Sequence, residues 1–151
     1  MTGPGATPIF VDTGAFYARA DEDDLHHETA LQLFERFRTG DLPFRPVVTS
    51  QAVLSELATL ALYSLGHDVA VRALNAIRNS ESINVLPVDR DTFETAAGQF
   101  EAYDDQDISF VDHTTGVLAE KRDIGHVFAF DSDFRTLGFT LVPADVGLSD
   151  G

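Results

Sequence analysis

The sequence predicts an α/β protein, a three-layer α/β/α sandwich built around a mostly parallel central sheet. Short apolar runs alternate with longer segments of helical periodicity, which is typical of βαβ units. The first run, residues 8–11, is apolar up to Asp12, as expected of a buried strand. At 151 residues the chain has the size of a single domain. We expect its ordered core over about residues 8–147, with frayed ends outside it.

Ten elements are expected between those ends. The expected strands are short aliphatic and aromatic runs, at residues 8–11, 46–48, 83–88, 127–130 and 139–142. The expected helices are longer segments with apolar residues at helical spacing, at 25–37, 51–65, 69–77, 92–103 and 110–121. The phenylalanine-rich stretch 34–44 is expected in the core and not on a base-stacking surface, because basic residues do not densely interleave it.

Composition excludes several classes of protein. The chain is 44% hydrophobic and 23% charged, which is ordinary for a globular protein. It has no cysteine, so disulfides, thiolate metal sites and a cysteine nucleophile are excluded. No apolar run approaches the length of a membrane span, and the first ten residues lack the regions of a secretory signal. We therefore expect a cytoplasmic protein.

The charge balance is strongly acidic. Asp and Glu number 25 against 10 for Lys and Arg, which gives a net charge of −15, and Lys121 is the single lysine. One interpretation is a protein that repels nucleic acids and anionic membranes. We favour the other, an adaptation to high salt, where the Debye length falls to about 3 Å at 1 M. The charge then does not exclude a nucleic-acid substrate.

Two of the expected strands lead directly into an aspartate, Asp12 and Asp131. Ligands of parallel sheets bind beyond the carboxyl ends of the strands, so both side chains are expected at the binding edge. Asp12 can equally serve only as the N-cap of a following helix. Asp133, two residues after Asp131, is also typical of a turn.

Glu56 is the single charged residue between positions 52 and 65. A helix that is apolar all round is buried, and burying an unpaired carboxylate is costly. Glu56 should therefore have an arginine partner, a metal ion or a raised pKa. An ion pair and a metal or catalytic role both remain open.

Asp112 lies at the start of the helix expected over 110–121. Ser109-x-x-Asp112 matches a capping box, so Asp112 can have a purely structural role, and Asp107 is an alternative N-cap. Other catalytic patterns are missing from the sequence. It has no H-E-x-x-H, G-x-S-x-G or P-loop motif, and no G-x-G-x-x-G follows the first strand.

Taken together, these residues resemble a PIN-domain ribonuclease, especially the VapC-type toxins of toxin–antitoxin pairs. The resemblance runs from Ile9 to about Val142 and depends on IFVDTGAF, SQAVLSELATLA, SFVDHTTG and FAFDSDF. It implies that the metal-binding and catalytic acids are Asp12, Glu56, Asp112 and Asp131, with Asp107, Asp133 and Thr13 as auxiliary residues. Carboxylates without cysteine or a histidine cluster independently suit one or two Mg²⁺ or Mn²⁺ ions. Without metal, their repulsion should raise their pKa values.

The resemblance also implies an activity and partners: an endoribonuclease that hydrolyses RNA phosphodiester bonds, an antitoxin protein that holds it, and a homodimer. The sequence departs from the family at Gly14, where a small hydroxyl residue is common, and in having few cations for an RNA groove. Candidate groove cations are Arg19, Arg45 and Arg135. Two alternatives remain open, a PIN-fold binding or assembly module without catalysis and a metal-dependent phosphatase.

Overall fold

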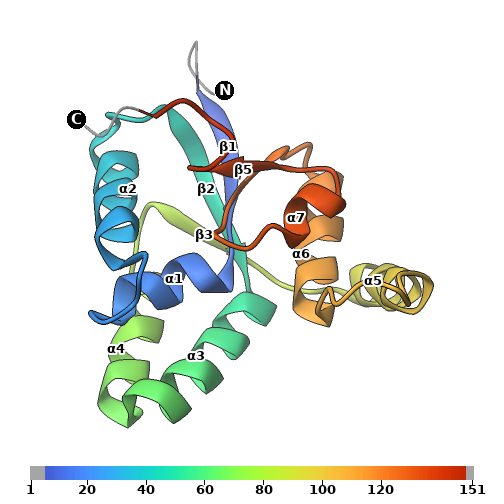
Figure 1. Ribbon diagram of the computed structural model, residues 1–151, viewed down its shortest axis with the longest axis horizontal. Helices are drawn as coiled ribbons and strands as arrows, with labels where there is room; N and C mark the ends of the chain where they lie inside the picture. Colours follow the sequence, from blue (N-terminus) through green and yellow to red (C-terminus); the bar gives the residue numbers. More distant parts are fainter. Residues whose placement is uncertain (1–5, 149–151) are drawn as a thin grey trace.

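Five strands form one parallel sheet in the computed structural model of the chain, which describes residues 6–148 (Figure 1). The strand order is β3-β2-β1-β4-β5, and each neighbouring pair is parallel. The strands are β1 (Thr7–Val11), β2 (Phe44–Ser50), β3 (Ile83–Leu86), β4 (His126–Phe128) and β5 (Thr140–Val142). All five overlap the strands that the sequence predicts.

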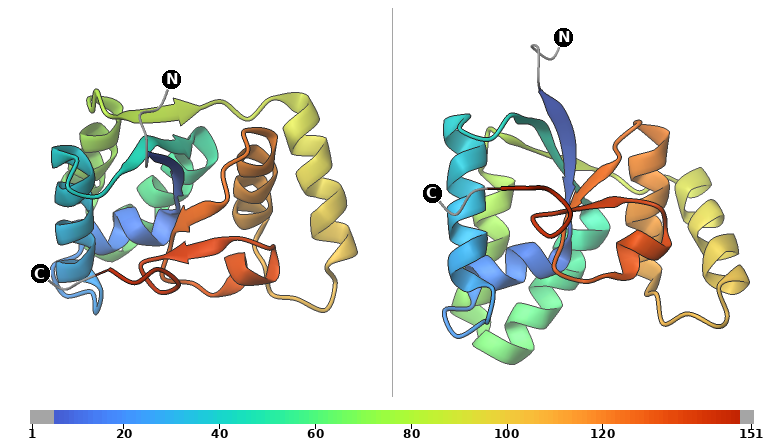
Figure 2. Two further views of the ribbon diagram at one scale, coloured as in Figure 1. Left: turned by 90° about the horizontal axis from the view of Figure 1, so that it is seen from above. Right: turned by 45° about the horizontal axis from the view of Figure 1, so that its top comes forward.

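Helices cover both faces of this sheet. They are α1 (Thr13–Ala20), α2 (His27–Thr39), α3 (Gln51–Leu65), α4 (His67–Arg78), α5 (Arg90–Ala102), α6 (Phe110–Lys121) and α7 (Asp133–Thr136). Seen from above, α2 and α4 lie on one side of the sheet and α5 and α6 on the other (Figure 2, left). The predicted three-layer α/β/α sandwich is confirmed.

Strand β1 lies at the centre of the sheet because it is apolar on both faces. Its residues Ile9, Phe10 and Val11 are completely buried, and it pairs with β2 on one side and β4 on the other. The chain first extends the sheet from β1 through β2 to β3, then continues on the opposite side with β4 and β5. This reversal places a topological switch point between β1 and β4, where parallel sheets form their ligand crevices.

The phenylalanine-rich stretch belongs to the core, as expected. The Phe37 ring contacts Phe44 and Phe128 edge to face, with centroids 5.6 Å away in each pair. Aromatic pairs with this geometry stabilise a core beyond their buried area. The contacts fasten α2 to the sheet through β2 and β4.

Several elements differ from the sequence prediction. Helices α1 and α7 were given no bounds from the sequence, although Asp12 was considered as the N-cap of a following helix and Asp133 as the start of a turn or short helix. β3 ends at Leu86, before Pro87, which has no backbone N–H for the sheet. β4 ends at Phe128, so Phe130 belongs to the loop beyond the sheet.

The prediction that the helix at 51–65 is buried on all sides is wrong. In α3 the side chains of Leu60, Leu62 and Tyr63 are 44%, 43% and 83% exposed. The helix packs against α1 and α4 with one face and leaves the other outside (Figure 1). The apolar residues of α3 therefore lie both in the core and on the surface of the protein.

Within residues 6–148, no helix is both long and apolar enough to cross a bilayer. The frayed ends expected from the sequence lie mostly outside the described residues. Thr7, which was expected in the frayed N-terminus, belongs to β1.

Candidate metal centre

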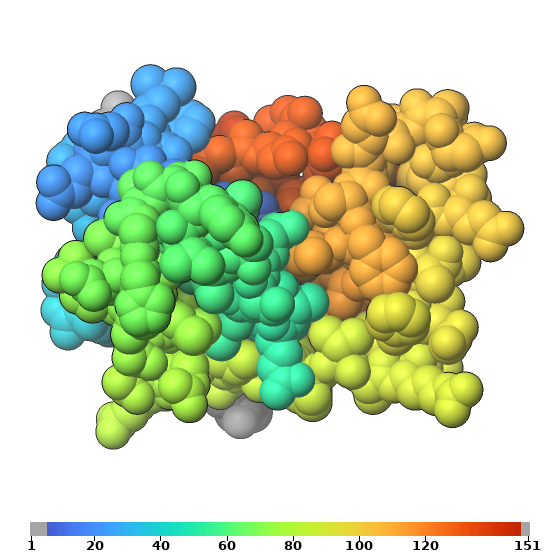
Figure 3. All heavy atoms as spheres, turned by 90° about the horizontal axis from the view of Figure 1, so that it is seen from below, coloured from blue at the N-terminus to red at the C-terminus, as the bar shows by residue number. Residues whose placement is uncertain are grey.

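A pocket of about 500 Å³ opens at the carboxyl edge of the sheet, beside the switch point. Figure 3 shows the molecule from this side, hollowed where α3, α6 and the segment after β4 meet. The site residues named from the sequence all line this pocket: Asp12, Thr13, Glu56, Asp107, Asp112, Asp131 and Asp133. The fold thus gathers residues from four separated parts of the chain.

Asp12 combines a structural role with a free oxygen atom. It follows β1 directly and is the N-cap of α1, and its Oδ2 accepts a hydrogen bond of 3.4 Å from the Gly14 N–H. The residue is 5% exposed, and Oδ1 has no hydrogen-bond partner among the described residues. The capping interpretation is therefore right for one carboxylate oxygen and leaves the other available to a ligand.

Asp112 is likewise held by helix capping. Ser109 is the N-cap of α6, and its hydroxyl accepts a hydrogen bond of 3.1 Å from the Asp112 N–H. Ser109, and not Asp107, is thus the cap residue. The cap directs the first turn of α6 toward the pocket, where Asp112 is 8% exposed.

Asp131 and Asp133 complete the tightest group of acids in the described part of the chain. Asp112, Asp131 and Asp133 each place one carboxylate oxygen within 4.8 Å of the other two. The Asp133 N–H donates a hydrogen bond of 2.9 Å to Asp131 Oδ1, which fixes the turn that carries both residues. Asp133, expected only as an auxiliary residue, is therefore a full member of this acid triad.

Glu56 lies on α3, half-buried, on another wall of the pocket. None of the ion pairs between described residues includes Glu56, so the structure does not support the alternative of an arginine partner. Its negative charge instead acts on other acids, since it contributes to the raised pKa values of Asp12 and Asp112.

Burial and mutual repulsion raise the pKa values of three pocket carboxyls, those of Asp12, Asp112 and Asp133. Burial, and then the charge of Asp112, raises the pKa of Asp12 to about 8. Burial, and then the charge of Asp131, raises the pKa of Asp112 to about 7. The pKa of Asp133 is also raised, by burial first and then by Asp131. The pocket is thus poised to exchange protons for a cation near neutral pH.

The donor set fits a divalent metal ion. Two buried oxygen atoms, Asp12 Oδ1 and Thr13 Oγ1, have no hydrogen-bond partner among the described residues, although such atoms are normally satisfied. Together with the acid triad they offer oxygen ligands only, which suit a hard cation such as Mg²⁺ or Mn²⁺.

No arginine or lysine is among the described residues that line the pocket. The three cations expected for an RNA groove therefore lie elsewhere. Arg19 and Arg45 line a separate groove, and the Arg19 guanidinium lies 4.2 Å from the centroid of the Phe34 ring. Arg135 forms an ion pair with Asp145, with 2.9 Å between Nε and Oδ2.

Sequence reasoning missed five further lining residues, Tyr17, Asp24, His26, Leu60 and Phe130. Tyr17 and Leu60 follow Thr13 and Glu56 by four positions in their helices, so the helical repeat was a usable signal. Asp24 and His26 lie on the loop between α1 and α2, which only the tertiary fold brings to the pocket.

A three-layer sandwich with an acid-lined pocket at its carboxyl edge is the arrangement of a PIN domain. The family model described as PIN domain matches residues 9–140. The chain belongs to the PIN-domain family.

Within that family, the chain is similar to the 23S rRNA-specific endonuclease VapC20 of Mycobacterium tuberculosis. The proteins of that name in strains H37Rv and CDC 1551 are each 38% identical to it over 135 residues, 89% of this chain and 97% of the relative. A crystal structure of the M. tuberculosis VapC20, described as a sarcin-ricin loop cleaving toxin, matches with a TM-score of 0.77 and 37% identity. The match covers 87% of this chain and 95% of that one.

Two more distant structures share the fold. FitAcB from Neisseria gonorrhoeae matches with a TM-score of 0.63 at 16% identity, over 88% of this chain and 95% of that one. VapBC2 from Rickettsia felis, bound to a promoter DNA fragment, matches with a TM-score of 0.61 at 12% identity, over 89% of this chain and 97% of that one.

Proposed function

We propose that the chain is a metal-dependent endoribonuclease and the toxin of a toxin–antitoxin pair. The observation that carries the proposal is the pocket, where the acid triad lies beside the unpartnered Oδ1 of Asp12. The relationship to VapC20 along nearly the whole chain supports RNA as the substrate. Since that relative is specific for 23S rRNA, 23S rRNA is the first substrate to test.

In this proposal each carboxylate has a role in metal binding that follows from its position in the pocket. Asp112, Asp131 and Asp133 hold the cation, and Asp12 and Glu56 add carboxylates from the deeper wall and from α3. When bound, Mg²⁺ or Mn²⁺ neutralises phosphate charge and lowers the pKa of a water molecule. Thr13 orients a carboxylate or water through its free hydroxyl, and Asp107 lies in the same lining. No protein nucleophile is needed.

The test is cleavage of labelled 23S rRNA with Mg²⁺ or Mn²⁺ by the wild type and by Asp12→Asn and Glu56→Gln. Both variants keep the shape of the side chain and remove its charge. Asp68→Asn and Glu94→Gln are matched controls, since both residues are exposed and lie outside the pocket. Equal cleavage by the pocket variants and the wild type would refute the assignment. Turnover of a small phosphomonoester without RNA cleavage would favour a phosphatase.

An antitoxin partner belongs to the same proposal, as does a cytoplasmic location where toxin, antitoxin and ribosome meet. A groove of about 780 Å³ between α2, α4 and the first residues of β2 is a candidate docking surface. Its lining combines aromatic residues with Arg19, Arg38 and Arg45, so it suits an apolar segment that carries acidic side chains. A short upstream reading frame that encodes a DNA-binding antitoxin would support this part of the proposal.

We also propose a homodimer. Large apolar side chains are partly exposed on α3 and α5, an arrangement typical of a protein–protein contact. They are Leu60, Leu62, Tyr63, Phe93 and Phe100. Light scattering in molar KCl should give the mass of two chains, and a monomer alone would overturn this proposal.

A further inference from the structure

Two aromatic rings lie face to face within the lining of the acidic pocket. The rings of His26 and Phe130 are nearly parallel, at 4°, with centroids 4.1 Å away from each other. Both residues line the pocket and both are only partly buried. We propose that this pair is a platform on which the RNA substrate stacks an unpaired base beside the phosphate that is cut. The inference rests on the proposed nuclease function and adds a substrate-binding site to it.

The charge of the pocket makes such a platform necessary. The described lining of the pocket contains no arginine or lysine. It contains seven acids: Asp12, Asp24, Glu56, Asp107, Asp112, Asp131 and Asp133. Phosphates away from the cation therefore gain nothing from side-chain charge here. A nucleobase has an uncharged π-face, and proteins bind unpaired RNA bases by stacking them on aromatic rings, histidine included.

The stack has a buried inner end and an accessible outer end. Phe130 contacts Phe128 edge to face, with centroids 5.7 Å away from each other and an angle of 75°, and Phe128 is completely buried. The order of rings from the core outward is therefore Phe128, Phe130 and His26. A base placed on the outer face of His26 would extend a stack that already exists.

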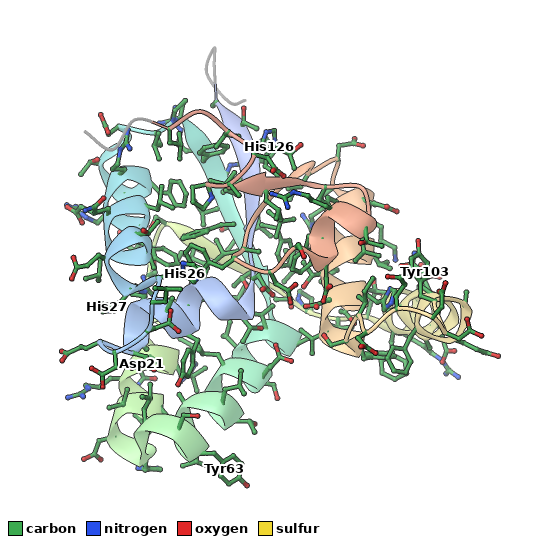
Figure 4. The ribbon with its side chains drawn as sticks, viewed as in Figure 1. Asp21, His26, His27, Tyr63, Tyr103 and His126 are labelled. Atoms are coloured by element: carbon green, nitrogen blue, oxygen red, sulfur yellow. The ribbon has the colours of Figure 1, made fainter. Side chains whose placement is uncertain are left out.

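Hydrogen bonds hold the loop that carries His26, both at His26 itself and at the next residue. Asp24 Oδ1 accepts a hydrogen bond of 2.8 Å from the His26 N–H. The next residue, His27, places its Nδ1 2.8 Å from the Ala18 carbonyl oxygen, to which it donates. Figure 4 labels both histidines where the loop from α1 enters α2. A platform fixed before the substrate arrives loses little entropy on binding.

The two neighbouring histidines differ in what their rings do. The His27 ring is held by its bond to Ala18, whereas no described residue makes a hydrogen bond with the ring of His26. Among the described residues, the contact that positions the ring of His26 is therefore its stacking on Phe130, which is the kind of contact that a base would make. Because Phe130 immediately precedes Asp131 and both line the pocket, we place the stacked base on a nucleotide next to the phosphate at the acid triad.

The first experiment compares His26→Ala with His26→Phe, using the RNA that the wild type cuts. The alanine variant removes the outer ring, and the phenylalanine variant keeps a ring without nitrogen atoms. We expect kcat/KM to fall roughly 5- to 100-fold in His26→Ala, the loss typical of one stacked base, mainly through KM, and to stay near wild type in His26→Phe. His67→Ala is the control, since His67 lies on α4 with its side chain 78% exposed.

A second experiment removes the base from the RNA and leaves the His26 ring in the protein. RNA with an abasic nucleotide next to the mapped cleavage site should be cut more slowly by the wild type, by about the same factor as in His26→Ala. If the platform binds that base, His26→Ala should lose no further activity on abasic RNA, because base and ring act as one pair. Independent, multiplying losses would overturn the inference.

Metal binding separates this inference from the proposed function. His26→Ala should bind Mn²⁺ like the wild type and remain folded at the assay temperature, so a loss of cleavage cannot come from the metal centre. If the wild type cuts no RNA, the nuclease proposal fails, and binding of fluorescein-labelled single-stranded RNA by wild type and His26→Ala still tests the platform. The inference fails if His26→Ala cuts or binds RNA as well as the wild type, or if His26→Phe is impaired equally.

Discussion

The acidic pocket and the groove between α2 and α4 are two hollows of one small domain with opposite charge. Seven acids line the pocket, and its described lining includes neither arginine nor lysine. Three arginines line the groove, with Glu35 as its one acid. Exposed acids are expected on a chain with a net charge of −15. The buried acids and the positions of the few cations therefore say more about what the protein binds.

The physical consequence of this difference concerns what each hollow can bind. Burial and repulsion between neighbouring carboxylates raise the pKa values of Asp12 and Asp112, so these groups bind a proton or a cation more readily than exposed carboxylates do. In the groove, Arg19 lies over Phe34 and Phe16 without a carboxylate partner among the described residues, so its charge is available to an anionic group. The charge of each lining therefore supports our proposals of a cation in the pocket and an acidic partner in the groove.

The largest expected effect contrasts one residue of each hollow. Asp112→Asn should lower RNA cleavage by roughly 10²–10³-fold, because it removes a charge from the acid triad. Arg45→Ala should leave cleavage within about twofold, because an exposed side chain outside the pocket has no part in the reaction. Initial rates on labelled 23S rRNA measure both. A comparable loss in Arg45→Ala would show that the two hollows act together on RNA.

The second prediction concerns stability against pH without metal. The pKa of Asp12 is raised from 3.8 to about 8, so the folded chain binds more protons than the unfolded chain between these values. Its contribution to stability is thus fully present below about pH 4 and is lost as the pH rises to about 8. Asp12→Asn should melt about 2–6 °C higher than the wild type at pH 8 in EDTA, since roughly 1 kcal/mol shifts Tm by 2–4 °C.

The control for this prediction is Asp68→Asn, whose side chain is 99% exposed in the folded chain. It should follow the wild-type melting curve at each pH. Asparagine is as good an N-cap as aspartate, so the cap of α1 survives in Asp12→Asn. A variant that melts lower than the wild type at pH 8 would contradict the burial of an unfavourable charge at Asp12.

The smallest expected effect is a rise of a few degrees in Tm between 0.1 and 1 M KCl, together with faster cleavage at fixed Mn²⁺. The Debye length falls over this range from about 10 Å to about 3 Å, which screens the repulsion among the 25 acids. Nucleic-acid binders that depend on basic surfaces lose affinity steeply with salt. A fall in both Tm and rate with added KCl would refute adaptation to high salt and would make the outer charge an obstacle to RNA.

Much of this architecture could be predicted from the sequence because the signals are local. Apolar runs such as residues 8–11 mark their strands, and the rule that parallel strands present ligands at their carboxyl ends placed Asp12 and Asp131 correctly. The full set of site acids from the sequence lines one pocket. The family resemblance supplied Glu56 and Asp112, whose local patterns also fitted structural roles.

What the sequence did not reveal depends on tertiary placement. Asp133 looked like a turn residue, and only the position of α6 brings Asp112 within 4.8 Å of it. His26 has no motif, and the loop before α2 carries it to the pocket. Arg19, Arg45 and Arg135 were named as candidate cations of an RNA groove, yet none of them lines the acidic pocket. The direction of a side chain such as Arg19 is set by the ring on which it packs.

The most direct test of a metal centre in the acidic pocket is a calorimetric titration with Mn²⁺ at pH 7, in two buffers of different ionisation enthalpy. We predict saturable binding with release of about one proton, because the pKa values of Asp12 and Asp112 lie near neutral pH and metal binding must displace their protons. Asp12→Asn should bind more than about tenfold more weakly, and Asp68→Asn like the wild type. The absence of saturable binding, or equal affinity in Asp12→Asn, would contradict the account.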